Sequence, residues 1–240
     1  MPNLSLTQDV VAQRGTPLLQ AAVRTLLDPF RSATVLAEAA AGSLDAPTPV
    51  GLPTWLFVLR SASLLEPPHV PAWRTALEGA AARASTSTGT LPWPTGGEPR
   101  AVDALVNLWL RRMGRVPTGP DPRGLYPTVE AAISRRDVAT LCAVVAAQGY
   151  PGLRDDGVAG RARGALVDLL TTSRLDGMDL PLVLESAILS GAGPKDRLAR
   201  LARESLGRCQ DARGMFPSAL GDGASLEATW WALLLLMRGG

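Results

Sequence analysis

Apolar residues recur with helical spacing along most of this chain, and segments of two kinds alternate. Segments of the first kind are predominantly apolar, and a helix that is apolar all round must be buried on all sides. They cover residues 54–65, 100–113, 138–147, 180–189 and 225–237. In the second of them, Val102, Leu105, Leu108 and Trp109 share one helix face. The pattern therefore predicts an inner layer of buried helices.

Segments of the second kind carry apolar residues on one face only, which is typical of helices in an outer layer. The clearest runs from residue 198 to residue 209. Its apolar face comprises Leu198, Leu201, Ala202, Ser205 and Cys209, and its solvated face comprises Arg197, Arg200, Arg203 and Glu204. We expect outer helices of the same kind over residues 16–41, 71–84, 128–135 and 158–172.

Two turn sequences are similar to each other, Asp121-Pro-Arg-Gly-Leu-Tyr-Pro and Asp211-Ala-Arg-Gly-Met-Phe-Pro. An apolar segment follows each turn, and the apolar segments begin roughly 40 residues apart, a spacing typical of helical-hairpin repeats. About five hairpins closed into a ring predict an all-α fold, an α/α toroid with inner and outer helix barrels. This toroid would form a single domain over residues 1–240. An open solenoid is the alternative, but it would leave the inner helices facing water.

Composition favours helices and excludes several kinds of site. Alanine and leucine dominate, isoleucine occurs twice, and no run of alternating β-branched residues predicts a strand. The chain has two cysteines, Cys142 and Cys209, and one histidine, His69, which excludes a disulfide framework and a Cys₂His₂ zinc site. The net charge of +2 argues against a nucleic-acid platform. We expect both cysteines to be buried and His69 to lie in a surface loop.

The ends of the chain predict a cytoplasmic location. The polar N-terminus lacks the pattern of a secretory signal. The longest apolar run, residues 228–237, has about half the length needed to cross a bilayer. We therefore expect no stable membrane span.

The segment Ser225-Leu-Glu-Ala-Thr-Trp-Trp-Ala-Leu resembles the repeat of the prenyltransferase and squalene-oxidase/terpene-cyclase superfamily. Those repeats run Asp-Gly-Gly-Phe, a glycine-rich stretch and then Ser-Leu-Glu-Ala-Thr-Tyr-Tyr-Ala-Leu. Here residues 209–219 correspond to the first half, and Gly221 and Gly223 to the glycines. The resemblance covers about 30 residues and implies the α/α toroid, but it does not imply one activity, because the fold hosts several chemistries.

This chain differs from that family in two kinds of catalytic motif, the zinc ligands and the acid motif. Prenyltransferase subunits and lanthipeptide cyclases bind zinc through Cys and His, and here His69 has no partnering motif. Class II terpene cyclases carry an Asp-x-Asp-Asp acid motif that this chain lacks; the nearest are Asp176-Gly-Met-Asp179 and Arg154-Asp-Asp156. We therefore expect neither metal nor cofactor.

Aromatic residues are the first candidate constellation, because their faces stabilise cationic or polyene substrates. Trp55, Trp109, Trp230 and Trp231 fall on predicted inner helices and Trp93 in a preceding loop. The predicted substrate-binding residues are Trp55, Trp93, Trp109, Trp230, Phe216 and Tyr126. Packing within the core is the alternative role for each of them.

Acidic residues at the starts of inner helices are the second constellation. The predicted proton donors are Asp103, Asp179 and Glu227; Asp137 also lies near a helix start, and Glu185 lies deeper in its helix. An acid that protonates an alkene or epoxide must sit in an apolar, water-poor site. Capping of helix N-termini is the alternative role, since carboxylates are favoured there.

A glycine-rich stretch from Gly157 to Gly164 superficially resembles a phosphate loop. It lacks the Gly-Lys-Ser/Thr ending and no strand precedes it, so we predict a helix with Arg161 and Arg163 exposed. A pyrophosphate clamp formed by these two arginines is the alternative.

These observations favour a metal-independent, cyclase-like enzyme of secondary metabolism. It would enclose an apolar polyene or isoprenoid-type small molecule, with a carboxylic acid as proton donor and aromatic walls. Two alternatives remain open, of which one is a non-catalytic toroid that binds a hydrophobic ligand or a protein. The other is a subunit that needs a partner chain or a second copy of itself.

Overall fold

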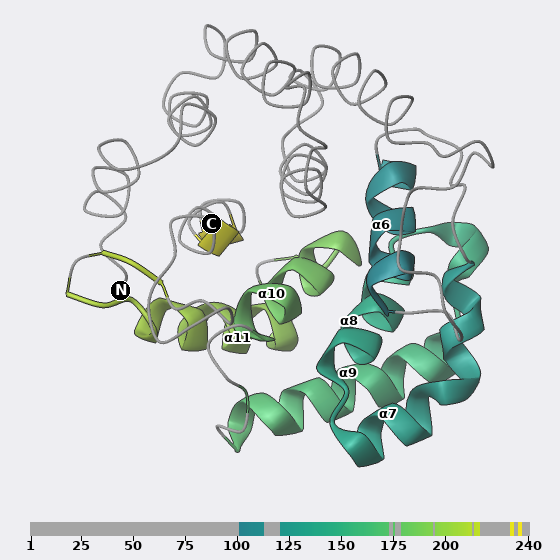
Figure 1. Ribbon diagram of the computed structural model, residues 1–240, viewed down its shortest axis with the longest axis horizontal. Helices are drawn as coiled ribbons and strands as arrows, with labels where there is room; N and C mark the ends of the chain where they lie inside the picture. The colour runs from purple at the N-terminus through teal and green to yellow at the C-terminus, as the bar shows by residue number, and fades with distance from the viewer. Residues whose placement is uncertain are drawn as a thin grey trace, which may run out of the picture.

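The computed structural model shows an all-α architecture in the part of the chain that it describes (Figure 1). The described residues are 101–112, 121–172, 175, 179–193, 195–212, 214–216, 231–232 and 235–236. These ranges contain helices and no strand, as the sequence predicts. The expected segments 16–41, 54–65 and 71–84 lie outside the described residues, and so does most of 225–237.

Six α-helices and two short 3₁₀ helices follow one another in the described part. In chain order they are α6 (Ala101–Arg112), η2 (Pro122–Thr128), α7 (Val129–Arg135), α8 (Val138–Ala147), η3 (Pro151–Leu153), α9 (Asp156–Thr171), α10 (Asp179–Leu189) and α11 (Arg197–Arg208). The predicted helices over 100–113, 128–135, 138–147, 158–172, 180–189 and 198–209 are therefore all confirmed, to within two residues at each end.

The helices form two layers, which confirms the predicted alternation (Figure 1). Helices α6, α8 and α10 pack side by side in one layer, and these are the predominantly apolar segments. Helices α7, α9 and α11 form the other layer: α9 contacts α7 and α11 within it and α8 across it, and α11 contacts α10 across it. Each connection thus carries the chain from one layer to the other, as in a stack of helical hairpins.

Helix α8 lies at the centre of this arrangement. Nine of its ten residues are buried, and only Ala139 is partly exposed. Because it has no polar face, it must be covered on every side. Helices α6, α7, α9, α10 and η2 all contact it.

Helix α11 shows that the predicted apolar face was rotated slightly. The buried residues are Leu198, Ala199, Ala202 and Leu206, whereas Ser205 and Cys209 lie at the margin of that face. Arg203 is not solvated as expected, because its guanidinium reaches inward and donates to the Leu236 carbonyl at 3.1 Å. A 100° step per residue moves marginal positions on or off the face with small changes of helix orientation.

Aspartate side chains begin three of the helices. Asp137, Asp155 and Asp196 each accept a hydrogen bond from the backbone N–H three residues later, at 3.1, 3.0 and 3.0 Å. Such caps satisfy an otherwise unpaired donor and stabilise a helix by about 1 kcal/mol each. Asp196 also forms an ion pair with Arg163 of α9, so this single residue starts α11 and joins it to its neighbour in the same layer.

The two similar turn sequences adopt related structures. In each, the glycine N–H donates to the carbonyl of the aspartate three residues earlier, at 2.9 Å for Gly124 and 3.0 Å for Gly214. Each aspartate side chain also accepts from a backbone N–H of its own turn. They differ in that Gly214 has a positive φ of 82°, whereas Gly124 lies within the 3₁₀ helix η2.

Helices α7 and α10 end in the same Schellman motif, but with different residues at its left-handed position. Arg136 donates to the Ile133 carbonyl and the next N–H to Ala132; Gly191 donates to Ile188 and the next N–H to Ala187. The φ angles are 57° at Arg136 and 81° at Gly191. Glycine adopts this conformation without steric cost, and a residue with a Cβ does not.

We therefore expect Arg136→Gly to stabilise the protein by roughly 0.5–1 kcal/mol, because it relieves left-handed strain at a helix end. The reciprocal Gly191→Ala should destabilise it by a similar amount, since a Cβ there meets no atom within 4 Å and only the backbone conformation opposes it. Urea unfolding monitored by circular dichroism would measure both. Equal midpoints for Arg136→Gly and the wild type would contradict the assignment of strain.

Close approach of α8 and α10 generates a second prediction. A Cβ on Gly149 would lie 2.0 Å from the Leu189 carbonyl oxygen, so Gly149→Ala must push the ends of the two helices apart. We expect a destabilisation of roughly 1–3 kcal/mol, typical of overpacking. Gly152→Ala is the matched control, because its Cβ would meet no atom within 4 Å. Similar unfolding midpoints for the two variants would rule out this contact.

Candidate functional site

A fully buried carboxyl group lies in the layer formed by α6, α8 and α10. Glu185 of α10 has 0% of its surface exposed, and buried apolar residues adjoin it along the same helix, Val183, Leu184 and Ala187. A glutamate is rarely buried completely unless its carboxyl group is paired, because removing a charge from water is costly. Glu185 is therefore the best-placed acid among the described side chains for chemistry in a water-poor site.

A buried thiol lies at the contact between α8 and α10. Cys142 of α8 is fully buried, and its burial raises the pKa of the thiol. Hydrogen bonding by Ser186 of α10 lowers this pKa, and the charge of Asp179 raises it. Cys142 is thus held as a neutral thiol, as expected for a buried small hydrophobic residue.

The predicted acids are only partly brought together. Asp179 is the first residue of α10 and is half-buried, about 9 Å along the helix axis from Glu185. Asp103 lies on α6, where the structure describes the backbone but not this side chain. Glu227 lies outside the described residues. Asp137 is a helix cap: its second carboxylate oxygen also accepts from the Thr140 hydroxyl at 2.7 Å.

The predicted aromatic residues that the structure describes are deeply packed. Trp109 of α6 and Phe216 each have 1% of their surface exposed and belong to the apolar core. Trp231 is also buried, with Ala232 and Leu235 near it in the sequence buried as well. Trp55, Trp93 and Trp230 lie outside the described residues.

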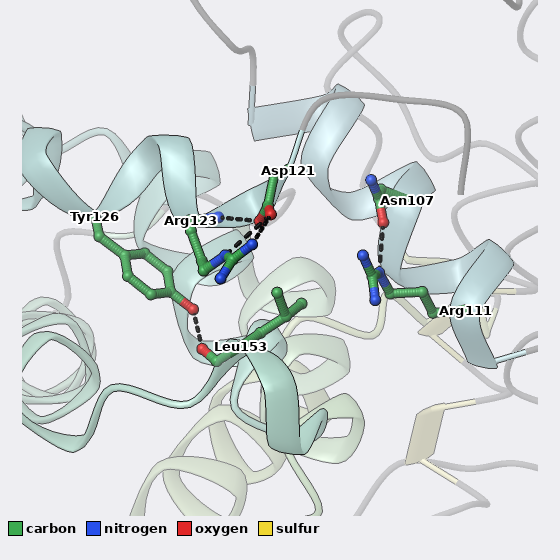
Figure 2. Close-up of polar contacts among 6 residues, drawn as sticks. All are labelled: Asn107, Arg111, Asp121, Arg123, Tyr126 and Leu153. Atoms are coloured by element: carbon green, nitrogen blue, oxygen red, sulfur yellow. Dashed lines mark hydrogen bonds and ion pairs between the residues drawn. The ribbon is translucent and has the colours of Figure 1, made fainter. Parts of the chain in front are cut away.

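Tyr126 is half-buried, and its hydroxyl is directed at the protein backbone. Figure 2 shows this hydroxyl pointing at the Leu153 carbonyl of η3, to which it donates a hydrogen bond. Burial raises the pKa of Tyr126. Beside it, Arg123 donates to Asp121 at 2.9 Å and 2.5 Å, and this hydrogen bonding lowers the pKa of the Asp121 carboxyl. The Tyr126 hydroxyl and the Asp121 carboxylate are thus both engaged in contacts that stabilise this turn.

A second polar contact in Figure 2 lies on α6. Arg111 donates through Nε to the Asn107 side-chain oxygen at 2.8 Å, and Asn107 is buried. Arg111 lies one helical turn after Asn107, so its side chain extends back along α6 to reach the amide. This arrangement satisfies part of a buried amide within the apolar layer.

Arg161 and Arg163 lie on α9, so the helix predicted for the glycine-rich stretch is confirmed. Arg161 is exposed and forms an ion pair with Glu130 at 2.7 Å. Arg163 is not exposed as expected: it pairs with Asp196 and donates to the Ser190 hydroxyl at 3.2 Å. The two guanidinium groups therefore bind different protein partners.

Among the described residues, no three His, Cys, Asp or Glu side chains are grouped in a way that could hold a metal ion. Nor does any helix in those ranges combine the length and the apolarity needed to cross a bilayer.

Comparisons with protein-family models, with curated proteins and with solved structures each gave no match to this chain.

Sequence reasoning ranked Glu185 below the acids at helix starts. The signal was available, because Glu185 is the only charged residue in the apolar segment 180–189. Asn107 gives the same signal in Leu105-Val-Asn-Leu-Trp109. A lone polar residue within an inner segment is a better indicator of a buried polar group than a position at the helix start, where capping competes.

Tyr150 joins the connection after α8 to α6, because its hydroxyl donates to the Leu108 carbonyl at 2.7 Å. Burial is the largest cause that raises the pKa of Tyr150 from its usual 10.0 to about 12. The folded state therefore holds this proton more tightly than the unfolded state. Its stabilising effect is complete below pH 10 and is lost as the pH rises from 10 to 12.

We expect the free energy of unfolding to fall across this alkaline range by no more than about 2 kcal/mol from Tyr150, since partial contact with water weakens the effect. Tyr150→Phe should flatten the fall, at the cost of about 1 kcal/mol near neutral pH from the lost hydrogen bond. Urea titrations at several pH values would measure both. An unchanged alkaline slope in Tyr150→Phe would assign the effect to other groups.

Proposed function

We propose that this chain is an α/α-toroid enzyme that encloses an apolar, polyene or isoprenoid-type substrate and protonates it from a buried carboxylic acid. Glu185 is the proposed acid. The observation that carries the proposal is its complete burial in an otherwise apolar helix of the inner layer. Burial of this kind favours the protonated form of a carboxyl group, which is the form that donates a proton.

The two-layer packing supports the toroid part of the proposal. In a closed ring of hairpins, the apolar segments form the inner barrel and the amphipathic ones the outer barrel, which is the division seen for α6 to α11. The proposed ring contains about five such hairpins, and the resemblance of residues 225–233 to the terpene-cyclase repeat supports the same closure.

The acid would act without a metal. A carboxylic acid can protonate an alkene or an epoxide where water is excluded and where aromatic faces stabilise the resulting cation. Asp179 is the second candidate donor, because it is half-buried on the same helix. Asp103 and Glu227 remain candidates from the sequence.

A non-catalytic, ligand-binding toroid is the second candidate, and one observation favours it. Trp109, Phe216 and Tyr126 are packed or hydrogen-bonded within the described core rather than displayed on a free surface. Aromatic residues used in this way stabilise the fold and leave no aromatic face to stabilise a cation, whereas binding of a hydrophobic molecule needs only an apolar surface. Such a protein would bind a hydrophobic molecule and release it unchanged.

A product assay with Glu185→Gln tests the proposal. The purified protein would be incubated with linear isoprenoids (squalene, oxidosqualene and geranylgeranyl diphosphate), and the products would be separated by gas chromatography and identified by mass spectrometry. We expect the wild type to convert at least one of them and Glu185→Gln to be slower by roughly 10²–10⁴-fold, since glutamine keeps the shape but cannot donate the proton. Glu204→Gln, an exposed glutamate on α11, is the matched control and should keep the wild-type rate.

Two outcomes would count against the assignment. A folded Glu185→Gln with the wild-type rate would exclude Glu185, and the same assay on Asp179→Asn would then test the second donor. Binding without turnover, detected as quenching of tryptophan fluorescence, would favour the non-catalytic alternative.

A further inference from the structure

A cleft whose lining does not include Glu185 lies where the ends of three helices converge. It has a volume of about 270 Å³ and is lined by Leu170, Leu175, Leu180, Ser205, Arg208 and Cys209. These residues come from the last turn of α9, the connection after it, the first turn of α10 and the end of α11. We call this the α9–α11 cleft.

One wall of the α9–α11 cleft is apolar. Leu170 and Leu180 are buried members of the core, and the half-buried Leu175 packs against it. Three leucine side chains give a surface that favours a short hydrocarbon chain, at roughly 0.8 kcal/mol for each buried methylene group.

The other wall is polar and carries one positive charge. Arg208 donates through Nε to the Glu204 carbonyl at 3.2 Å, which fixes the base of the guanidinium, and within the described residues Arg208 forms no ion pair. Cys209 donates to the Ser205 carbonyl at 3.4 Å, and burial raises the pKa of its thiol, so this residue adds no charge. The terminal nitrogens of Arg208 are therefore available to an anion at the cleft.

We propose that the α9–α11 cleft binds a small monocarboxylate of about eight carbons in all, with the carboxylate on Arg208 and the apolar tail against the leucines. Guanidinium groups match carboxylates with paired hydrogen bonds. The cleft is slightly smaller than sites for drug-sized ligands, which begin at about 300 Å³, so the ligand is a small one. This inference does not depend on Glu185 or on the proposed catalysis.

Octanoate binding to the full-length protein tests the inference, and Cys209 serves as an internal reporter. The chain has two cysteines, and Cys142 is fully buried, so N-ethylmaleimide should alkylate Cys209 alone in the folded protein. We expect octanoate to slow this alkylation several-fold, with a dissociation constant of roughly 0.1–1 mM. Octan-1-ol, which has the same tail without the charge, should protect less. Peptide mass spectrometry would identify the labelled cysteine.

Two arginine variants separate charge recognition from general apolar binding. Arg208→Gln should weaken octanoate binding about tenfold, because a charge-assisted contact is lost. Arg197→Gln removes an exposed arginine from the other end of the same helix and should leave the binding constant unchanged. Because Arg208 lowers the pKa of Cys209, each variant is compared with and without octanoate rather than by its absolute rate.

Three results would overturn the inference: no protection by octanoate well above the expected constant, equal affinity in Arg208→Gln, or equal affinity for octan-1-ol. Circular dichroism would establish that each variant is folded. We expect both variants to fold, because Arg197 and Arg208 are exposed.

Discussion

The described part of this protein depends on one constraint, the absence of a polar face on helix α8. Valine, leucine, alanine and cysteine occupy every position of this helix except that of Thr140, whose hydroxyl binds the Asp137 cap. Full burial of each large aliphatic side chain contributes roughly 1.5–3 kcal/mol, so exposing any side of the helix would be costly. Neighbours on all sides are the consequence, and a two-layer stack supplies them.

The connections between the two layers provide hydrogen-bond partners for the backbone N–H and C=O groups at the helix ends. Helix ends carry unpaired N–H and C=O groups, and a buried end would leave them unsatisfied. Aspartate caps at three helix starts and the Schellman turns after α7 and α10 satisfy them within the chain. The glycine-containing turns beginning at Asp121 and Asp211 repeat one solution, and each places a buried apolar residue and an aromatic residue on the core, Leu125 with Tyr126 and Met215 with Phe216. The two turn sequences are therefore similar because each turn packs the same kinds of side chain against the core.

The apolar periodicity predicted the described helices and their two classes because burial sets that pattern directly. Helix α8 matches its predicted range residue for residue, since its hydrophobic run and its aspartate cap mark both ends. Side-chain details were less accessible to the sequence. Arg203 was expected in solvent because arginine is usually exposed, but its aliphatic stem lets the charged end reach a carbonyl on another helix. For the candidate site, position at a helix start was a misleading guide, because capping explains Asp137 fully, whereas the acid with the greatest burial lies mid-helix.

Glu185 places a carboxyl group in the layer whose apolar side chains shape the fold, and its presence there needs an explanation. At a position with no exposed surface in an apolar layer, a leucine would add packing, and replacing buried ionisable groups by apolar ones often stabilises proteins. A carboxyl group retained there lowers stability unless its interactions offset the cost of leaving water. Proteins accept such a cost at sites where function needs a group that stability does not, and the proposed function would explain why α10 keeps a carboxyl group at this position.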